Sequence, residues 1–153
     1  MAVDQRTFIY ITGGNPKDLN KPSDRCLRLD IRNGEQVELP SLINARFDHS
    51  SIILNSKLYV MGGIVGFGKR LGSIECFDLK KNFGWYMIVE ANEKVERQAS
   101  AVAAISASQI LVYGGQINTG SRSNCGYIFD ISSHSVREIL GKDRDFSFIC
   151  LSK

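Results

Sequence analysis

The chain has 153 residues, 43% of them hydrophobic and 23% charged, which are the proportions of a folded protein rather than a disordered one. Its net charge of +3 falls far short of the concentrated basic face of a nucleic-acid-binding protein, so we expect no nucleic-acid partner. No apolar run approaches the roughly 18 residues of a membrane span, and the N-terminus has no apolar segment typical of a secretory signal. We therefore expect no membrane partner either.

The first part of the chain predicts three short β-strands, which we label b, c and d. Strand b is rich in Ile, Tyr and Thr and stops at a glycine pair, where the backbone is free to turn out of the strand. A polar loop leads to strand c, and an Asn-Gly pair predicts a tight hairpin into strand d. The expected elements are strands over 7–12, 25–30 and 36–39, with the glycine pair at Gly13-Gly14 and the hairpin at Asn33-Gly34, all within a unit spanning 7–42.

The second and third units repeat this pattern and add a strand a in front of it. Each strand a carries small or β-branched residues, and each strand b again stops at a glycine pair. Neither unit shows a sustained 3.6-residue apolar period, so an all-β fold is predicted. The second unit spans 46–91, with strands over 49–54, 57–61, 74–79 and 85–89. The third spans 97–140, with strands over 100–105, 109–113, 127–131 and 136–140.

A further strand a is predicted at 144–151, where the chain matches the openings of the second and third units. Three independent markers keep the phase of the repeat at a period near 50 residues, which indicates a repeat architecture. They are the glycine pairs Gly13-Gly14, Gly62-Gly63 and Gly114-Gly115, the arginines Arg46, Arg97 and Arg144, and the aspartates Asp30, Asp78 and Asp130. Because the aspartates recur in every unit, we expect them to cap turns rather than to catalyse a reaction.

Four cysteines are widely spaced and form no Cys-x-x-Cys pair, so a zinc site is not expected. We predict that they are reduced thiols, which indicates an intracellular and cytoplasmic protein. The alternative is a disulfide between neighbouring units of a secreted chain. The cysteines are Cys26, Cys76, Cys125 and Cys150.

These features resemble the kelch repeat, and the resemblance covers nearly the whole chain. The matching features are an Arg before strand a, an apolar strand b ending in Gly-Gly, an aromatic-Asp pair on strand c, and a Trp on strand d. The aromatic-Asp pairs are Phe77-Asp78 and Phe129-Asp130, whereas the first unit has Leu29 at the aromatic position. The Trp is present only as Trp85.

The resemblance implies kelch-type β-propeller blades of four antiparallel strands, with strand a innermost. The chain holds three blades' worth of strands, and on this prediction the first blade lacks its own strand a. Two interpretations stay open. The chain is a part or a small member of a longer kelch protein, or it forms a homodimer in which two copies complete a six-bladed ring and 144–151 completes the partner's first blade.

The resemblance also implies a non-catalytic adaptor or scaffold that binds a protein or peptide. We expect partner binding at the face made by the b–c and d–a loops. The b–c loops are long and unlike one another, and variable loops on a rigid scaffold are where recognition is usually placed. They carry more basic than acidic residues, which favours an acidic partner. The residues predicted to contact the partner are Asn15, Lys17, Lys21, Phe67, Lys69, Arg70, Gln116, Asn118 and Arg122.

No catalytic residue, metal centre or cofactor is expected from the sequence. Only two histidines are present, and His49 on strand a is predicted to form a structural hydrogen bond. The alternative function is a kelch-type enzyme, metal-dependent or acting on a sugar acid at the channel mouth. For the repeated arginines, bonds to loop carbonyls or to a neighbouring blade's carboxylate are favoured over anion binding.

Overall fold

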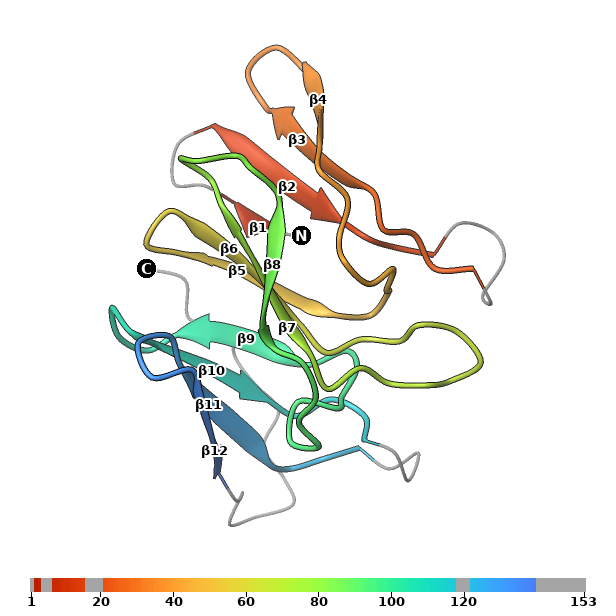
Figure 1. The fold of residues 1–153 in the computed structure, drawn as a ribbon, viewed down its shortest axis with the longest axis vertical. Coiled ribbons are helices and arrows are strands. Elements are labelled where there is room, and N and C mark those ends of the chain that lie inside the picture. The colour runs from red at the N-terminus through yellow and green to blue at the C-terminus, as the bar shows by residue number, and fades with distance from the viewer. Residues whose placement is uncertain (1, 4–6, 16–20, 118–121, 140–153) are drawn as a thin grey trace.

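The computed structural model describes residues 2–3, 7–15, 21–117 and 122–139, and in these residues the secondary structure consists of β-strands joined by turns and loops, without a helix. Twelve strands form three antiparallel four-stranded sheets that follow one another in an arc (Figure 1). The all-β prediction of four-stranded blades is therefore confirmed. The strands are β1 (Ala2–Val3), β2 (Phe8–Thr12), β3 (Cys26–Asp30), β4 (Gln36–Leu39), β5 (Ser50–Leu54), β6 (Lys57–Met61), β7 (Ile74–Asp78), β8 (Trp85–Val89), β9 (Ala101–Ala104), β10 (Gln109–Tyr113), β11 (Gly126–Asp130) and β12 (Ser135–Ile139).

Each sheet is a meander in which every strand pairs with the next one along the chain. The turn between β5 and β6 shows how local sequence sets the register. Asn55 and Ser56 both have positive φ, at 53° and 59°, and such a two-residue turn matches the twist of the strands it joins. Leu54 therefore pairs with Lys57, and the two strands stay in register as far as Ser50 and Met61.

The first sheet differs from the prediction, which gave it no strand a. Ala2 and Val3 form β1, which pairs antiparallel with β2 through Ala2–Tyr10 and Val3–Ile9. The sheet therefore has four strands within this chain. The segment 144–151, predicted to complete a partner's first blade, lies outside the described residues, and the position foreseen for it is occupied by β1.

The middle sheet is covered on both faces by its neighbours. Leu58 and Val60 of β6 point toward the first sheet, where Leu58 packs with Tyr10. The alternate residues, Tyr59 and Met61, point toward the third sheet and form the largest buried cluster with residues of β10 and β11. All four are at most 2% exposed, and burying a side chain of this size stabilises a fold by about 1.5–3 kcal/mol.

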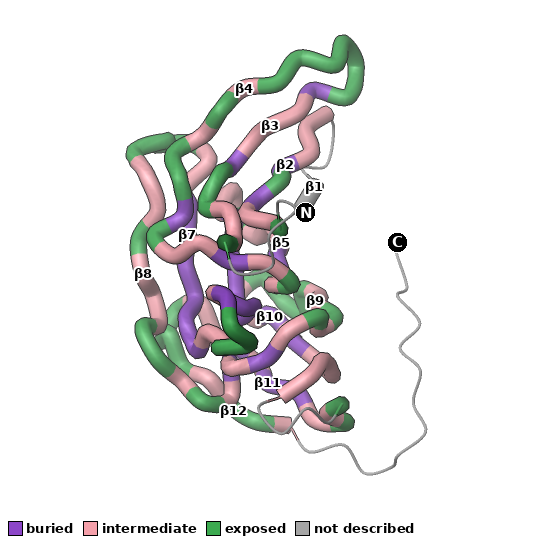
Figure 2. Tube along the Cα trace, turned by 90° about the vertical axis from the view of Figure 1, so that its right-hand side faces the viewer, coloured by how far each residue is buried: buried purple, intermediate pink, exposed green. Residues whose placement is uncertain are grey.

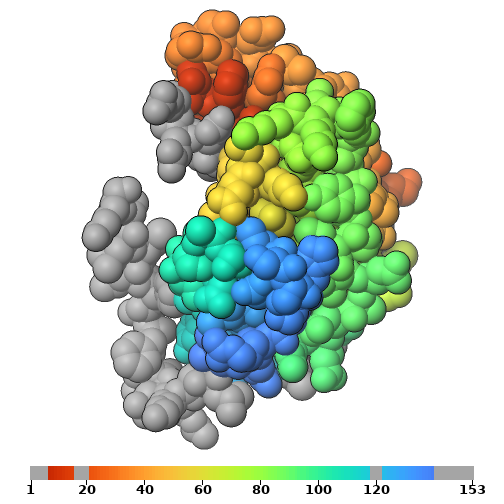
Figure 3. Space-filling view, turned by 60° about the vertical axis from the view of Figure 1, so that its left-hand side comes forward, coloured from red at the N-terminus to blue at the C-terminus, as the bar shows by residue number. Residues whose placement is uncertain are grey.

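The inner edge of the arc is formed by β1, β5 and β9, and β5 contacts both of the others. Figure 2 shows these three strands on one side of the molecule and β4, β8 and β12 along the opposite, outer side. Small residues suit the crowded inner edge, as the resemblance implies: Ser50 packs closely enough to donate a hydrogen bond to the Ser100 carbonyl at 2.8 Å. The space-filling view shows the three sheets in contact side by side (Figure 3).

Two further observations concern the described residues as a whole. None of their segments is a helix with the length and apolar character needed to span a bilayer. Cys26, Cys76 and Cys125 are free thiols, and burial raises the pKa of the Cys26 thiol to about 11. Cys125 lies just before β11 rather than in a strand, and Cys150 lies outside the described residues.

Candidate functional site

The b–c loops and the linkers between sheets lie at one end of the molecule, on the right of Figure 1. The a–b and c–d turns lie at the other end. We call the first end the loop face. In the described residues it consists of 13–15, 21–25, 40–49, 62–73, 90–100, 114–117 and 122–125.

The glycine pairs allow the linkers to pass very close to the ends of the b strands. Gly62 and Gly63 have φ of +66° and +91°, a region that residues with a Cβ rarely adopt. A Cβ on Gly62 would lie 2.5 Å from the carbonyl oxygen of Arg97 in the next linker. Gly62 is thus required both by its backbone conformation and by the close approach of the next linker.

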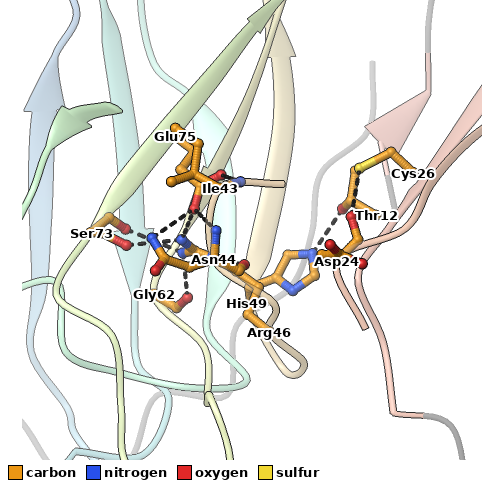
Figure 4. A network of polar contacts seen from close by, with 10 residues as sticks. All are labelled: Thr12, Asp24, Cys26, Ile43, Asn44, Arg46, His49, Gly62, Ser73 and Glu75. Atoms are coloured by element: carbon orange, nitrogen blue, oxygen red, sulfur yellow. Dashed lines mark hydrogen bonds and ion pairs between the residues drawn. The ribbon is translucent and has the colours of Figure 1, made fainter. Parts of the chain in front are cut away.

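Arg46 ties the first two sheets together from a fully buried position. Its backbone carbonyl accepts a hydrogen bond from the Gly14 N–H of the first sheet at 2.9 Å. Its guanidinium donates to the Gly62 carbonyl at 2.8 Å and to the Ser73 hydroxyl at 2.9 Å in the second sheet (Figure 4). It also forms an ion pair with Glu75, in which both side chains are 0% exposed. The structure therefore favours the loop-carbonyl and carboxylate interpretation of this arginine.

Glu75 was not singled out in the sequence, yet it organises the first linker. Its two carboxylate oxygens accept hydrogen bonds from the backbone N–H groups of Ile43 and Asn44 at 2.8 and 3.0 Å. The only sequence signal was a charged residue inside the otherwise apolar run of β7. Since buried charges are tolerated when paired and hydrogen-bonded, this carboxylate fixes the linker in place.

Arg97 repeats the junction between the second and third sheets with a different partner. Its backbone carbonyl accepts from the Gly63 N–H at 2.9 Å, and its guanidinium donates to the carbonyls of Gly114 at 3.1 Å and Cys125 at 3.0 Å. Tyr127 occupies the place of Glu75, and the Arg97 guanidinium lies 5.2 Å from the centre of its ring. The arginine is 5% exposed and has the same structural role as Arg46. Arg144 lies outside the described residues.

His49 packs between the first two sheets, where its Nε2 lies 2.8 Å from the Thr12 hydroxyl (Figure 4). The predicted structural hydrogen bond is thus present. Burial and the nearby charge of Arg46 lower the pKa of the imidazole to about 3, so the ring is neutral at neutral pH. A neutral histidine with this partner joins strands and has no acid–base role near pH 7.

The b–c loop of the middle sheet is a small hairpin that presents Phe67 at its tip. The Val65 N–H donates to the Lys69 carbonyl at 3.0 Å, and the Lys69 N–H donates to the Gly66 carbonyl at 3.0 Å. Phe67 has a φ of +48° and is 89% exposed. A large apolar side chain held in water on a left-handed backbone is uncommon and can mark a contact surface.

Arg70 joins this hairpin to the b–c loop of the third sheet. Its Nε donates to the Gln116 carbonyl at 3.2 Å, and the Gln116 side chain accepts from the Gln98 amide at 2.8 Å. Arg122 lies beside Gln116 through an isolated β-bridge. A cavity of about 490 Å³ opens here and is lined by Ala99, Gly115, Gln116 and Arg122. Three of the predicted contact residues, Arg70, Gln116 and Arg122, are therefore brought together.

The first sheet contributes a separate part of the loop face. Asn15 and Lys21 are exposed there, and a smaller cavity of about 270 Å³ includes Asn15, Gly14 and Arg25 in its lining. Lys17 and Asn118 lie outside the described residues.

The repeated aspartates cap turns at the opposite end, as predicted. Asp78 accepts from the backbone N–H groups of Lys80 and Lys81 at 3.0 and 3.1 Å, and these bonds lower the pKa of its carboxyl. Asp130 caps the equivalent turn in the third sheet in the same way. Within the described residues, no group of three or more His, Cys, Asp or Glu side chains is placed to hold a metal ion.

The three meanders, packed face to face around a shared inner edge, define the class as β-propeller blades. Residues 45–82, which contain the end of the first linker and strands β5, β6 and β7, match the family model of the Kelch motif. An F-box/kelch-repeat protein of Arabidopsis thaliana is 38% identical over 73 residues, which cover 47% of this chain and 18% of that protein. A putative F-box/kelch-repeat protein of the same plant is 38% identical over 93 residues, covering 58% of this chain and 24% of that protein. The chain is therefore similar to kelch-repeat proteins, and the matched segments cover about a fifth of the length of these two relatives.

Proposed function

We propose that the chain is a non-catalytic protein-interaction module that binds an acidic segment of a partner protein on the loop face. The proposal rests chiefly on the hydrogen bond from Arg70 to Gln116, which joins the loops of two sheets into one surface. Relatives whose names carry the kelch repeat beside an F-box support an interaction role.

The chemistry of this surface fits an extended acidic peptide. Lys69 is exposed, and Arg70 uses its Nε for Gln116 while its terminal nitrogens have no partner among the described residues. Guanidinium groups bind carboxylates in bidentate geometry, and the exposed ring of Phe67 offers apolar area beside them. The specificity of such a site would come from its positive charge and from one exposed aromatic side chain, Phe67.

The test uses labelled acidic and basic peptide pools of matched length and measures binding by fluorescence anisotropy. We expect the acidic pool to bind, and binding to weaken as salt rises because exposed charges are screened. The double change Lys69→Glu with Arg70→Glu should remove most of the binding. The matched control, Lys80→Glu with Lys81→Glu, makes the same charge change at the opposite end and should leave binding unchanged.

A second pair of variants tests the aromatic anchor. Phe67→Ser should weaken binding several-fold without lowering the melting temperature, since the ring is 89% exposed. Phe83→Ser removes an equally exposed ring, at 93%, from a turn at the opposite end and is the control. Equal loss in both variants, or retained binding in the Lys69–Arg70 variant, would reject the loop face as the site.

A further inference from the structure

Among the described residues, the two outer sheets of the arc each leave one apolar face without a neighbouring sheet, and the two open faces are of opposite kinds. Every b strand directs alternate residues to the preceding sheet and to the following sheet. We call the side of a sheet that faces the preceding sheet its N-face and the side that faces the following sheet its C-face. The first sheet has no neighbour on its N-face, and the third has none on its C-face among the described residues.

The N-face positions show what the first sheet lacks. Val60 and Val112, the residues two places before the glycine pairs of the second and third sheets, are 0% and 1% exposed. Ile11 holds the same position in the first sheet and is 41% exposed. Ile9 lies on the same face and is only partly buried, although its equivalents Leu58 and Ile110 are fully buried.

The C-face positions show the complementary gap in the third sheet. Tyr10 of the first sheet and Tyr59 of the second are 5% and 2% exposed because each packs on the following sheet. Leu111 holds this position in the third sheet and is only partly buried. Each uncovered face thus carries large apolar residues at the positions that pack against the other kind of face inside the chain.

Within the part of the chain that the structure describes, the hydrogen-bond pattern of the junctions is not repeated at these two open faces. At both internal junctions an arginine carbonyl accepts from the second glycine of one sheet, and the arginine side chain donates to the first glycine of the next. At the C-face end, the Gly115 N–H has no acceptor among the described residues. At the N-face end, no described arginine side chain reaches the Gly13 carbonyl.

We infer that this chain associates head to tail with a second copy, the C-face of the third sheet of each copy packing on the N-face of the first sheet of the other. We expect a second copy to cover each open face because the two internal junctions already show how a C-face packs on an N-face, with the same residue positions and the same hydrogen bonds. Two copies of three sheets give six blades, which lies within the four to eight of known propellers. Two identical heterologous contacts then close the assembly and prevent open-ended growth.

The first experiment measures the mass of the purified chain by light scattering over a wide range of concentration. We expect twice the mass of a single 17.0 kDa chain. A monomer at all concentrations would overturn the inference, and so would larger species that grow with concentration, because these would mean that the ring does not close.

The second experiment asks whether the contact joins two different faces. Ile11→Lys places a charge on the N-face and Leu111→Lys places one on the C-face, and each variant alone should be monomeric. An equimolar mixture should form a dimer again, since the intact C-face of the first variant meets the intact N-face of the second. Ile31→Lys, on an exposed turn of the first sheet, is the control and should stay dimeric.

Circular dichroism checks that the variants are folded. Both substituted side chains lie on open faces, so the variants should keep the β-sheet spectrum. Folded variants that stay dimeric would overturn the proposed interface, as would a mixture that remains monomeric. The inference does not depend on the loop-face proposal, since peptide binding and dimer mass are measured separately and either can fail alone.

Discussion

At the first junction, one buried ion pair is expected to make a large contribution to the stability of the fold. The ion pair of Arg46 with Glu75 is completely buried, whereas that of Arg25 with Glu38 has both side chains 65% exposed. Removing one partner of a buried pair leaves an uncompensated charge and typically costs 3–5 kcal/mol, but an exposed pair contributes about 0–1 kcal/mol. The two pairs therefore form a natural comparison within one chain.

We predict that Glu75→Gln lowers the free energy of unfolding by about 3 kcal/mol, because Arg46 then lacks its counter-charge in a fully buried position. Glu38→Gln is the matched control and should change it by less than about 1 kcal/mol. Urea unfolding followed by circular dichroism measures both. Similar values for the two variants would show that the buried pair contributes no more than the surface pair.

A pH dependence follows from His49. Its pKa is about 3 in the folded chain and 6.5 when unperturbed, so the unfolded state binds the proton more readily. The stabilisation is therefore complete above pH 6.5 and is lost as the pH falls from 6.5 toward 3. Since the ring is only partly enclosed, we expect a loss on the order of 1 kcal/mol by pH 5.

The measurement is the urea midpoint at pH 7 and at pH 5 for the natural chain and for His49→Gln. Glutamine can still bond to Thr12 but does not titrate, so the variant should lose much less stability between the two pH values. An equal loss in both proteins would assign the acid sensitivity to other groups.

At the scale of strands and turns, the glycine pairs combine two constraints that can be separated. Gly62 needs a positive φ and also has the Arg97 carbonyl where a Cβ would go, whereas Gly34 has a φ of +75° with nothing within 4 Å. Gly34→Ala should thus cost only the backbone strain, about 1 kcal/mol. Gly62→Ala should cost at least about 2 kcal/mol more, since the linker backbone would have to move.

Thermal unfolding of these two variants measures the difference. Comparable melting temperatures would mean that the linker backbone moves at little cost in free energy.

The glycine pairs also illustrate which features of the fold could be predicted from the sequence. The paired glycines and repeated aspartates marked the ends of strands correctly, because backbone conformation is a local property. The two-residue strand β1 carried no such mark, since Ala2 and Val3 gain their structure only by pairing with Tyr10 and Ile9.

At the scale of the whole molecule, contacts between sheets were the least predictable feature. The sequence indicated long variable loops, but not that Arg70 of one loop would reach Gln116 of the next, because this depends on the angle between sheets. In the same way, the sequence showed Glu75 only as an isolated charge in a strand, because its partner Arg46 lies in a linker 29 residues away in the sequence. Periodicity predicts blades, whereas the pairing between blades emerges only in three dimensions.

The same scale gives a prediction about stability. If folding is coupled to ring closure by two copies, the melting temperature rises with protein concentration, since mass action favours the associated folded state. Each tenfold increase contributes about 1.4 kcal/mol per mole of dimer at room temperature. Differential scanning calorimetry at several concentrations should show this rise for the natural chain and for Ile31→Lys. Ile11→Lys should melt at one temperature throughout, because its N-face can no longer bind a second copy, and a concentration-dependent melt in that variant would place the contact between copies elsewhere on the molecule.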